Sequence, residues 1–542
     1  MKLLNWLLYE VHRWLGILLA VFMFAWFSTG IAIMYSTPTR QSRIQQLAHA
    51  EILAPEANWL SLGEVWERSA EPRKAAAAER RVKPAGNTEA AGKQPPIPLA
   101  IAEARLLRIA GEPVWLVEDT HGMRFALSAV DGALRETSAE QALIIAKNWF
   151  EAEGGEAAEP SYLATVDKAI ILRNQDTLRP FHHIGTEDGR ELLISARTGE
   201  VLHASTRLDR ALYWGGNWLH LLKPLEAIGL GEYRHTIQLG LGLFATIASL
   251  TGLIIGWLRW RPGFGGKPTY SQGRTQPYRE FWAKWHFWSG LLGGSVALFW
   301  AFSGFLDTNP GKLFTEENYS KAELSRFLGG EVPAAMRDWR PEALITPAPD
   351  GREVVELVWR RLGDEALLLA NTRDGRRLPQ TLNGASPRFG EAAMRAAVQR
   401  LAGETPIASL EELNDYDSYY YPRHHQGPAE KPLPVVLANL GDDSGTLVYL
   451  DPQDGRLIGK VDRSRRVFRW LYSALHHWDF GWLYYRPIWD VWMLVWISFG
   501  LVLGASSVVI GWRRLKKSLA PKKQAAPRTV AAGGKLKTEN AT

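Results

Sequence analysis

The chain of 542 residues contains no cysteine. This absence excludes disulfides, cysteine-ligated iron–sulfur clusters, a thiolate nucleophile and the C-x-x-C-H attachment of covalent haem. Charged residues are missing from four long stretches, although they make up 22% of the whole sequence. The mean hydropathy of −0.17 shows that most of the chain is polar enough to lie outside a membrane. The composition therefore fits neither a mostly intramembrane transporter nor an ordinary soluble protein.

Each uncharged stretch has at least 22 residues, enough to cross a hydrocarbon core of about 30 Å as a helix rising about 1.5 Å per residue. Tryptophan and tyrosine are frequent at the ends, as expected for side chains at the headgroup level. The first stretch has no small-x-small cleavage site, so we expect an uncleaved anchor rather than a signal peptide. We predict four transmembrane helices, within residues 1–39, 236–258, 285–306 and 491–512.

Basic residues are concentrated in two segments next to these stretches. The linker 259–284 carries six Lys or Arg and one Glu, and the tail 513–542 carries nine Lys or Arg and one Glu. Because loops rich in Lys and Arg stay in the cytoplasm, we expect this linker and both termini there. Residues 40–235 and 307–490 then face the other side, which is the periplasm in a Gram-negative cell. The composition of the tail predicts disorder.

The two halves of the sequence repeat the same features in the same order. With an offset of 274 residues, the first and third stretches agree at His12/His286, Trp14/Trp288, Gly16/Gly290, Leu18/Leu292, Trp26/Trp300 and Gly30/Gly304. With an offset of 256 residues, the outside segments agree at Gly199/Gly455, Arg207/Arg463, Arg210/Arg466, Trp214/Trp470, Leu219/Leu475 and His220/His476. Each half ends with a Gly-Trp pair, Gly256-Trp257 and Gly511-Trp512. We interpret the chain as an internal duplication.

Each outside segment shows signals of an α+β fold. Thr198-Gly199 and Asp454-Gly455 lie between apolar runs and predict turns between strands. Residues 139–153 and 391–401 have the spacing of amphipathic helices. The stretch 67–98, rich in Ala, Glu, Lys and Pro, predicts a flexible insertion in the first segment only. The predicted fold class is an α+β membrane protein, with four transmembrane helices and two outside domains.

Histidine, glycine and tryptophan share one face of the first stretch. At about 100° per residue, three residues fall within about 40° of His12 around the helix: Gly16, Trp26 and Gly30. The third stretch repeats the pattern from His286, with Gly290, Trp300 and Gly304. A histidine in a membrane helix is costly and marks a functional candidate, and glycine lets a helix or a flat macrocycle approach the backbone. The alternative is a glycine packing seam with an interfacial histidine.

Topology groups the repeated histidines into two pairs. His12 and His286 lie at cytoplasmic helix ends, whereas His220 and His476 lie outside, just before the second and fourth helices. A membrane thickness of about 30 Å separates the two pairs, so they predict one inner and one outer site. Two imidazoles lined by Trp, Phe and Gly suit a six-coordinate haem b at each site, and a structural zinc is disfavoured without cysteine. Two less certain ligands can replace a partner at the outer site: His235 and His477.

For the other histidines and for four aromatic residues, the sequence allows two roles each. His182-His183 and His424-His425 would line a substrate site or bind a metal, or lie on exposed surface. Four aromatic residues near the outer site either shape a docking surface or anchor the chain at the membrane interface: Trp214, Trp218, Trp470 and Tyr472.

At these residues the sequence resembles the PepSY-associated transmembrane family of bacterial inner-membrane proteins. The likeness covers roughly residues 1–517 and rests on His-x-Trp-x-Gly at 12–16 and 286–290, and on the strand turn followed by Arg, Trp and Leu-His. The resemblance implies PepSY-like outside domains and a role in iron acquisition, because the family includes ferric-siderophore reductases of the ferrioxamine-utilisation type, with four membrane helices and two b-type haems. Some relatives carry a fused flavin reductase domain. This chain has no G-x-G-x-x-G after a strand, so a separate electron donor is implied.

The main hypothesis is a reductase that passes electrons through two haem b groups to a periplasmic ferric siderophore and releases Fe(II). Hard oxygen ligands hold Fe(III) better than Fe(II), so reduction frees the iron. The expected partners are the siderophore, an unidentified donor and the lipid bilayer, but no nucleic acid. A transporter of iron, haem or siderophore is one alternative, although the predicted helices have no internal charges and no proline breaks. The other is a non-enzymatic membrane protein whose PepSY-like domains regulate a protease.

Overall fold

The computed structural model describes residues 2–36, 41–82, 101–153, 159–172, 175–315, 319–341, 351–380, 388–423, 429–483 and 485–519. The contacts divide the chain into two units. The first unit comprises Met1–Phe27, Ile247–Leu298 and Ser498–Thr542, and the second comprises Ser28–Thr246 and Phe299–Ile497. Each unit is described by itself below.

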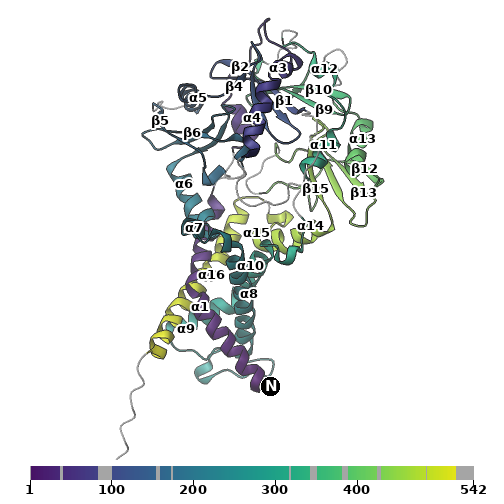
Figure 1. Ribbon diagram of the computed structural model, residues 1–542. Helices are drawn as coiled ribbons and strands as arrows, with labels where there is room; N and C mark the ends of the chain where they lie inside the picture. Colours follow the sequence, from purple (N-terminus) through teal and green to yellow (C-terminus); the bar gives the residue numbers. More distant parts are fainter. Residues whose placement is uncertain are drawn as a thin grey trace, which may run out of the picture. The chain divides into compact units, whose positions relative to one another are not determined.

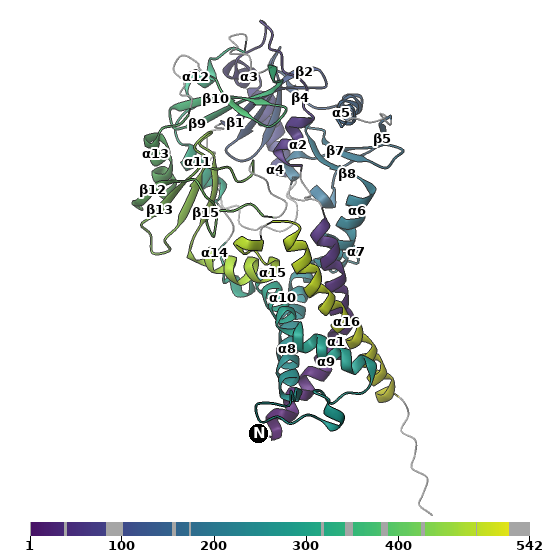
Figure 2. The same cartoon turned by 180° about the vertical axis from the view of Figure 1, so that it is seen from behind.

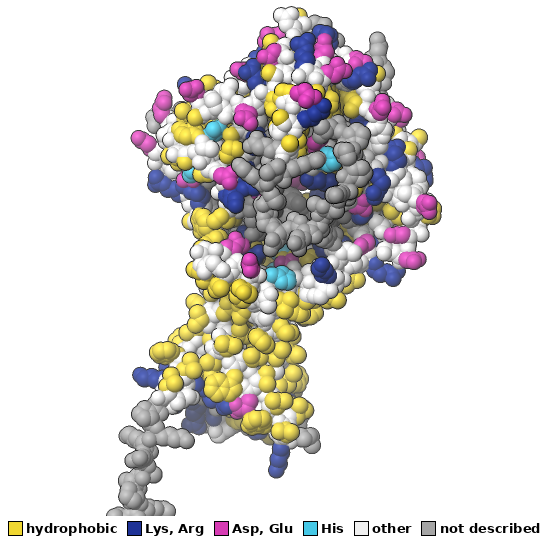
Figure 3. Space-filling view, viewed as in Figure 1, with side chains coloured by type: hydrophobic (Ala, Val, Ile, Leu, Met, Phe, Trp, Pro, Cys, Tyr) yellow, Lys and Arg dark blue, Asp and Glu magenta, His cyan; other side chains and the backbone are white. Residues whose placement is uncertain are grey.

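Among the described residues, three helical segments are long and apolar enough to cross a membrane: α1 (Lys2–Tyr35), residues Gly231–Arg259, which include α8 (Arg234–Arg259), and α16 (Ile488–Leu519). A further pair, α9 (Phe281–Leu292) and α10 (Gly294–Asp307), passes the same test together and brings the count to four if it is one span. Hydrophobic side chains cover the face of these helices in Figure 3. The chain is therefore a membrane protein by the length and composition of its helices.

The third predicted span differs from the structure in one respect. Instead of one helix over residues 285–306, α9 and α10 meet at a bend of 67°. Two consecutive glycines, Gly293 and Gly294, lie at this bend and weaken the helix locally. A Cβ at Gly293 would lie 2.7 Å from the Cβ of Phe499, so only glycine lets the bend pack against α16.

The outside segments contain the α+β elements that the sequence predicts. The first segment contains α2 (Arg43–Ala48), α3 (Leu62–Arg68), α4 (Ala70–Val82), β1 (Ile101–Ile109), β2 (Glu112–Asp119), β3 (Arg124–Ser128), β4 (Leu134–Arg135), α5 (Ala139–Ala152), β5 (Ser161–Val166), β6 (Phe181–Gly185), β7 (Glu191–Ser195), β8 (Val201–Ser205), α6 (Arg207–Tyr213) and α7 (Pro224–Ala227). The second contains α11 (Lys321–Leu328), α12 (Ala334–Arg337), β9 (Val354–Leu362), β10 (Glu365–Thr372), β11 (Arg377–Pro379), α13 (Glu391–Ala402), β12 (Ile407–Leu413), β13 (Val435–Leu440), β14 (Leu447–Leu450), β15 (Leu457–Val461), α14 (Arg463–Phe468) and α15 (Ala474–His477).

One sheet combines strands from both outside segments, so they are not two separate domains. Its seven strands have the order β11-β10-β9-β1-β2-β3-β4, and β9 lies beside β1 in both views (Figures 1 and 2). β1 and β9 pair antiparallel, with Leu106 opposite Leu357. Without this pairing both strands would be edge strands with unpaired backbone N–H and C=O groups, and the pairing satisfies these groups. Trp115 and Trp359 are fully buried in the core of this sheet.

Each segment also has a four-stranded antiparallel sheet of its own, β5-β6-β7-β8 in the first and β12-β13-β14-β15 in the second. A helix packs on each sheet: α5 buries Ala146 and Trp149, and α13 buries Ala397 and Val398. Ser138 starts α5 with a capping box in which its hydroxyl accepts from Gln141. The same order of sheet, helix and sheet therefore occurs twice.

The predicted flexible insertion at 67–98 is helical in its first part. α4 (Ala70–Val82) is rich in alanine, which favours a helix, and it buries Ala77 and Arg73. The guanidinium of Arg73 lies 3.2 Å from the ring centre of Trp66. This contact fixes α4 on α3. Residues 83–98 lie outside the described residues.

Candidate functional site

The inner histidine pair comes together within the first unit. The ring centres of His12 on α1 and His286 on α9 lie 6.3 Å apart, with the rings tilted by 47°. Nδ1 of His12 lies 3.0 Å from the carbonyl oxygen of Ala248 and 3.5 Å from Oγ1 of Thr251. Nδ1 of His286 lies 3.2 Å from Oγ of Ser506. In both rings Nδ1 is therefore engaged by a neighbouring helix.

The outer histidines have matching contacts within the second unit. Nδ1 of His220 lies 3.0 Å from Oγ1 of Thr29 on α1, and Nδ1 of His476 lies 3.0 Å from Oγ of Ser303 on α10. The indole N–H of Trp300 donates to the carbonyl of His476 over 2.9 Å. Burial, with the nearby imidazoles of His477 and His220, holds the pKa of His476 well below its usual range. A metal-ligating imidazole must be neutral, and this direction of the pKa favours the neutral form of His476.

A π-helical turn precedes each outer histidine. These turns are Trp214–Trp218 before His220 and Arg469–Ser473 before His476. A π-helical turn holds an additional residue and changes the direction of the side chains that follow, and such turns are frequent at functional sites. In the first of them, a Cβ at Gly216 would lie 2.6 Å from the backbone N of Ile33, so glycine allows the turn to approach α1.

The hydroxyl partners of the histidines are functional candidates that the sequence analysis missed. Thr29 and Ser303 are 274 residues apart, the offset that relates His12 to His286. Thr251 and Ser506 are 255 residues apart, the offset that relates Gly256 to Gly511. Extending the repeat comparison from identical residues to hydroxyl residues would have found both pairs.

The spacing of the inner histidine pair suits a haem. With metal–nitrogen bonds of about 2 Å and ring centres about 1 Å behind each nitrogen, two imidazoles on one iron have ring centres about 6 Å apart, close to the 6.3 Å between His12 and His286. A Cβ at Gly16 or Gly30 would meet no described atom within 4 Å, so each leaves free space on the histidine face of α1. Within the described ranges, no three His, Asp or Glu side chains gather as ligands for a bare metal ion.

A family model for the PepSY-associated TM region matches residues 9–397. The chain belongs to this family. The sequence-based assignment to the family is thereby confirmed, and the match includes His12, His220 and His286 but ends before His476. No curated protein matches the sequence.

Four other residues that the sequence predicts to pack against haem contact the protein itself. Gly290 and Gly304 have ordinary contacts, with Leu503 at 3.5 Å and with Cε1 of His476 at 3.6 Å from a Cβ built on each. Trp300 holds the backbone of His476, as described above, and the ring of Trp26 lies 4.0 Å from that of Phe22. The close α1–α16 contact uses other glycines, Gly500 against Phe27 and Gly504 against Phe24.

His235 and His477, the two alternative ligands of the outer site, have contacts that differ from those of His220 and His476. Nε2 of His235 lies 2.8 Å from the carbonyl oxygen of Thr308. The ring of His477 lies edge-on to Tyr472 at 5.1 Å and to His476 at 5.2 Å, and the carbonyl of His477 accepts from Trp489. The contacts of Nδ1 with Thr29 and with Ser303, which His220 and His476 share, make these two our preferred outer pair.

The adjacent histidines in strand β6 point to opposite faces of the sheet, because side chains alternate along a strand. His182 is buried between the hydroxyl of Tyr162 and the carbonyl of Thr137. His183 pairs with Glu191 over 2.9 Å. The two rings therefore do not form one metal site. His424 and His425 lie outside the described residues.

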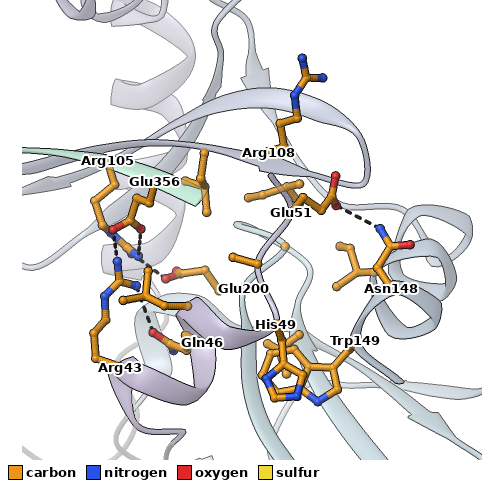
Figure 4. Close-up of a pocket in the computed structure, with 17 residues that line it drawn as sticks. Arg43, Gln46, His49, Glu51, Arg105, Arg108, Asn148, Trp149, Glu200 and Glu356 are labelled. Atoms are coloured by element: carbon orange, nitrogen blue, oxygen red, sulfur yellow. Dashed lines mark hydrogen bonds and ion pairs between the residues drawn. The ribbon is translucent and has the colours of Figure 1, made fainter. Parts of the chain in front are cut away.

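A cavity of about 90 Å³ in the outside segments is lined in part by α2, which carries Arg43 and Gln46 (Figure 4). Its polar wall is a network of ion pairs: Arg105 contacts Glu200 at 2.6 Å and Glu356 at 3.3 Å, and Arg43 also pairs with Glu356. The ring of His49 stacks on Trp149 at 4.0 Å. The network joins β1, β9 and the turn before β8. Because its positive and negative charges compensate one another, we assign it a structural role.

Removing the hydroxyl that holds an outer histidine should weaken the site. If the outer pair holds a haem, Thr29→Val and Ser303→Ala should lower haem affinity about 10- to 100-fold, because a partner on Nδ1 orients a ligating imidazole and raises its basicity. Haem transfer from the purified variants to excess apomyoglobin measures this. Thr246→Val is the matched control, since Thr246 bonds only its own helix, at the carbonyl of Gly242. Equal transfer rates in all variants would contradict the assignment.

Proposed function

We propose that this chain is a di-haem b inner-membrane reductase. It takes electrons from a donor on the cytoplasmic side and reduces a ferric siderophore in the periplasm, so that iron is released as Fe(II). The chain would be an internal duplication with four membrane spans, α9 and α10 forming the third. The family assignment supports a PepSY-associated membrane role, and the histidine sites lead us to the reductase.

One observation carries this proposal. Each of the four repeated histidines has its Nδ1 engaged by an oxygen of a neighbouring element, and the hydroxyl partners are themselves related by the repeat. A ring held at Nδ1 presents Nε2 as the ligand, which is the usual arrangement of a metal-bound imidazole. Simple packing histidines would not need equivalent partners in both halves.

The distribution of charge supports the orientation. The linker and the tail are strongly basic, and under the positive-inside rule this supports a cytoplasmic position for them and for both termini, with the sheets in the periplasm. His12 and His286 would then hold the inner haem, and His220 and His476 the outer one. Bound haem would supply one-electron transfer, and the protein positions and insulates it. Fe(III) held by hard oxygen ligands is released on reduction because Fe(II) binds them less tightly.

The purified full chain tests the proposal. We expect about two haems per chain and a low-spin spectrum typical of two imidazole ligands. After reduction with dithionite, addition of a ferric siderophore should reoxidise the haem, and a ferrous chelator should detect Fe(II). Purified protein without haem, or reduced haem that no ferric chelate reoxidises, would refute the reductase.

The bend between α9 and α10 favours a second candidate, a transporter of iron, haem or siderophore. Broken membrane helices are frequent at transport sites, and the 67° bend at Gly293 is such a break. Uptake of labelled ferric siderophore into proteoliposomes in the absence of any reductant would support transport. Strict dependence of iron release on reductant, without such uptake, would support the reductase.

A further inference from the structure

Equivalent residues contact each other beside the outer histidine in both halves of the chain. In the first half, Gly216 lies against α1, and a Cβ built on it would be 2.6 Å from the backbone N of Ile33. The equivalent residues of the second half, at the offsets of 256 and 274, are Tyr472 and Asp307. The Tyr472 hydroxyl makes a hydrogen bond with the Asp307 carboxylate. The first half therefore has a close backbone contact where the second half has a polar pair of side chains.

The ring of Tyr472 lies directly on the preferred outer ligand of the second half. It stacks on the imidazole of His476 with ring centres 5.2 Å apart and an angle of 27° between the planes. Burial, and after it the nearby charge of Asp307, raise the pKa of the Tyr472 hydroxyl above its usual range. The hydroxyl therefore keeps its proton and donates it in the hydrogen bond to the carboxylate. One face of the His476 ring is thus covered by a ring that is fixed to α10.

Two side chains of α10 hold this part of the second half. Ser303 and Asp307 are four residues apart on α10, so they lie on the same face of the helix. Oγ of Ser303 lies 3.0 Å from Nδ1 of His476, and Asp307 accepts from Tyr472. Four residues of a helix rise about 6 Å, so the carboxylate lies about one turn beyond the hydroxyl that holds the imidazole.

The Asp307 carboxylate brings negative charge to the outer site. Asp307 is solvent-exposed, and an exposed carboxyl is ionised at neutral pH. The charges of Arg423 and Asp479 also act on Tyr472, but these two groups pair at 3.1 Å, so their opposite charges offset each other. The equivalent positions of the first half carry no ionisable side chain. A negative charge near a haem stabilises its Fe(III) form over its Fe(II) form and so lowers the reduction potential.

We propose that Tyr472 and Asp307 are a positioning pair that lowers the reduction potential of the haem held by His220 and His476. This inference rests on the proposed function. Tyr472 fixes the His476 ring and the carboxylate, and the carboxylate supplies the charge. In the reaction one electron passes from the ferrous outer haem to the Fe(III) of the siderophore. Because oxygen ligands favour Fe(III), this iron is hard to reduce, and a low potential at the outer haem favours the transfer.

Asp307→Asn tests the inference in the full chain, since it removes the charge and keeps an acceptor for the Tyr472 hydroxyl. We expect the equilibrium between oxidised and reduced outer haem to shift about tenfold toward the reduced form, a rise of about 59 mV for one electron. Asp307→Glu keeps the charge and should restore the wild-type potential. Tyr472→Phe keeps the ring but frees the carboxylate, so the potential should rise by a smaller amount. A redox titration followed by the haem spectrum measures these values.

Asp338→Asn is the matched control, because it removes a carboxylate that pairs with Arg337 on the outside segment. An outer-haem potential that is unchanged in Asp307→Asn would overturn the inference, and so would an equal rise in Asp338→Asn. Should Asp307→Asn lose the outer haem, Tyr472→Phe decides, and a wild-type potential in that variant would overturn the inference. Wild-type protein without any haem would instead overturn the proposed function, which keeps the two failures distinguishable.

Discussion

Replacing His476 by alanine should lower the haem content of the purified protein from about two per chain to about one. His476 is held by Ser303 and Trp300, and neither can replace an imidazole as a ligand. His286→Ala should remove the other haem, since its ring faces His12 in the separate inner pair. The haemochrome assay measures the content, and redox difference spectra show which of the two species remains.

The same assay separates the candidate ligands. We expect His235→Ala and His477→Ala to retain both haems, because the pattern of hydroxyl partners is found at His220 and His476. His183→Ala, which removes only the ion pair with Glu191, controls for general effects of losing a histidine. Loss of one haem in His477→Ala, with both retained in His476→Ala, would assign the outer ligand to His477 instead.

Replacing Arg105 by methionine should destabilise the outside sheets by about 3–5 kcal/mol, the cost of breaking a buried ion pair from one side. Arg105 is 8% exposed and contacts three carboxylates, those of Glu103, Glu200 and Glu356. Without the Arg105 guanidinium, the three carboxylates stay buried with less positive charge nearby to balance them. Because β1 and β9 come from different halves, the change should also loosen their pairing. Tryptophan fluorescence during urea unfolding in detergent measures the effect.

Arg108→Met provides the matched control on the same strand. Arg108 pairs with Glu56, which is 65% exposed, and such surface pairs contribute less than about 1 kcal/mol. Equal urea midpoints for the two variants would contradict a structural role for the network around Arg105.

Acid should act on this network in the wild type. Desolvation raises the pKa of the Glu200 carboxyl, but Arg124 and Arg105 outweigh it and hold the pKa well below its usual range. A carboxyl whose folded pKa is depressed stabilises the protein above its unfolded pKa of about 4.3 and loses that contribution as the pH falls further. The urea midpoint should therefore decline below about pH 4.5, and Glu200→Gln should reduce this decline. A urea midpoint that does not change with pH down to about pH 3 would contradict a stabilising role for the Glu200 charge.

The sequence by itself determined the features that depend on local composition and on comparison between the halves. Uncharged stretches of more than 20 residues indicated the membrane helices because their length matches the bilayer. The motif around His12 and His286 indicated the family, which the family model confirmed. The repeat also predicted which histidines belong together, and the structure brings His12 and His286 to 6.3 Å.

Only the tertiary structure decided how distant segments combine. The pairing of Leu106 with Leu357 joins strands about 250 residues apart, and alternation along a strand predicts which side chains share a face but not which strand pairs with it. The close contact of Gly293 with Phe499 joins two helices that lie far apart in the chain. Thr29 and Ser303 hold the outer imidazoles across the fold, and Asp307 holds the hydroxyl of Tyr472. These contacts join residues far apart in the chain, so periodicity and composition, which are local properties, carry no information about them.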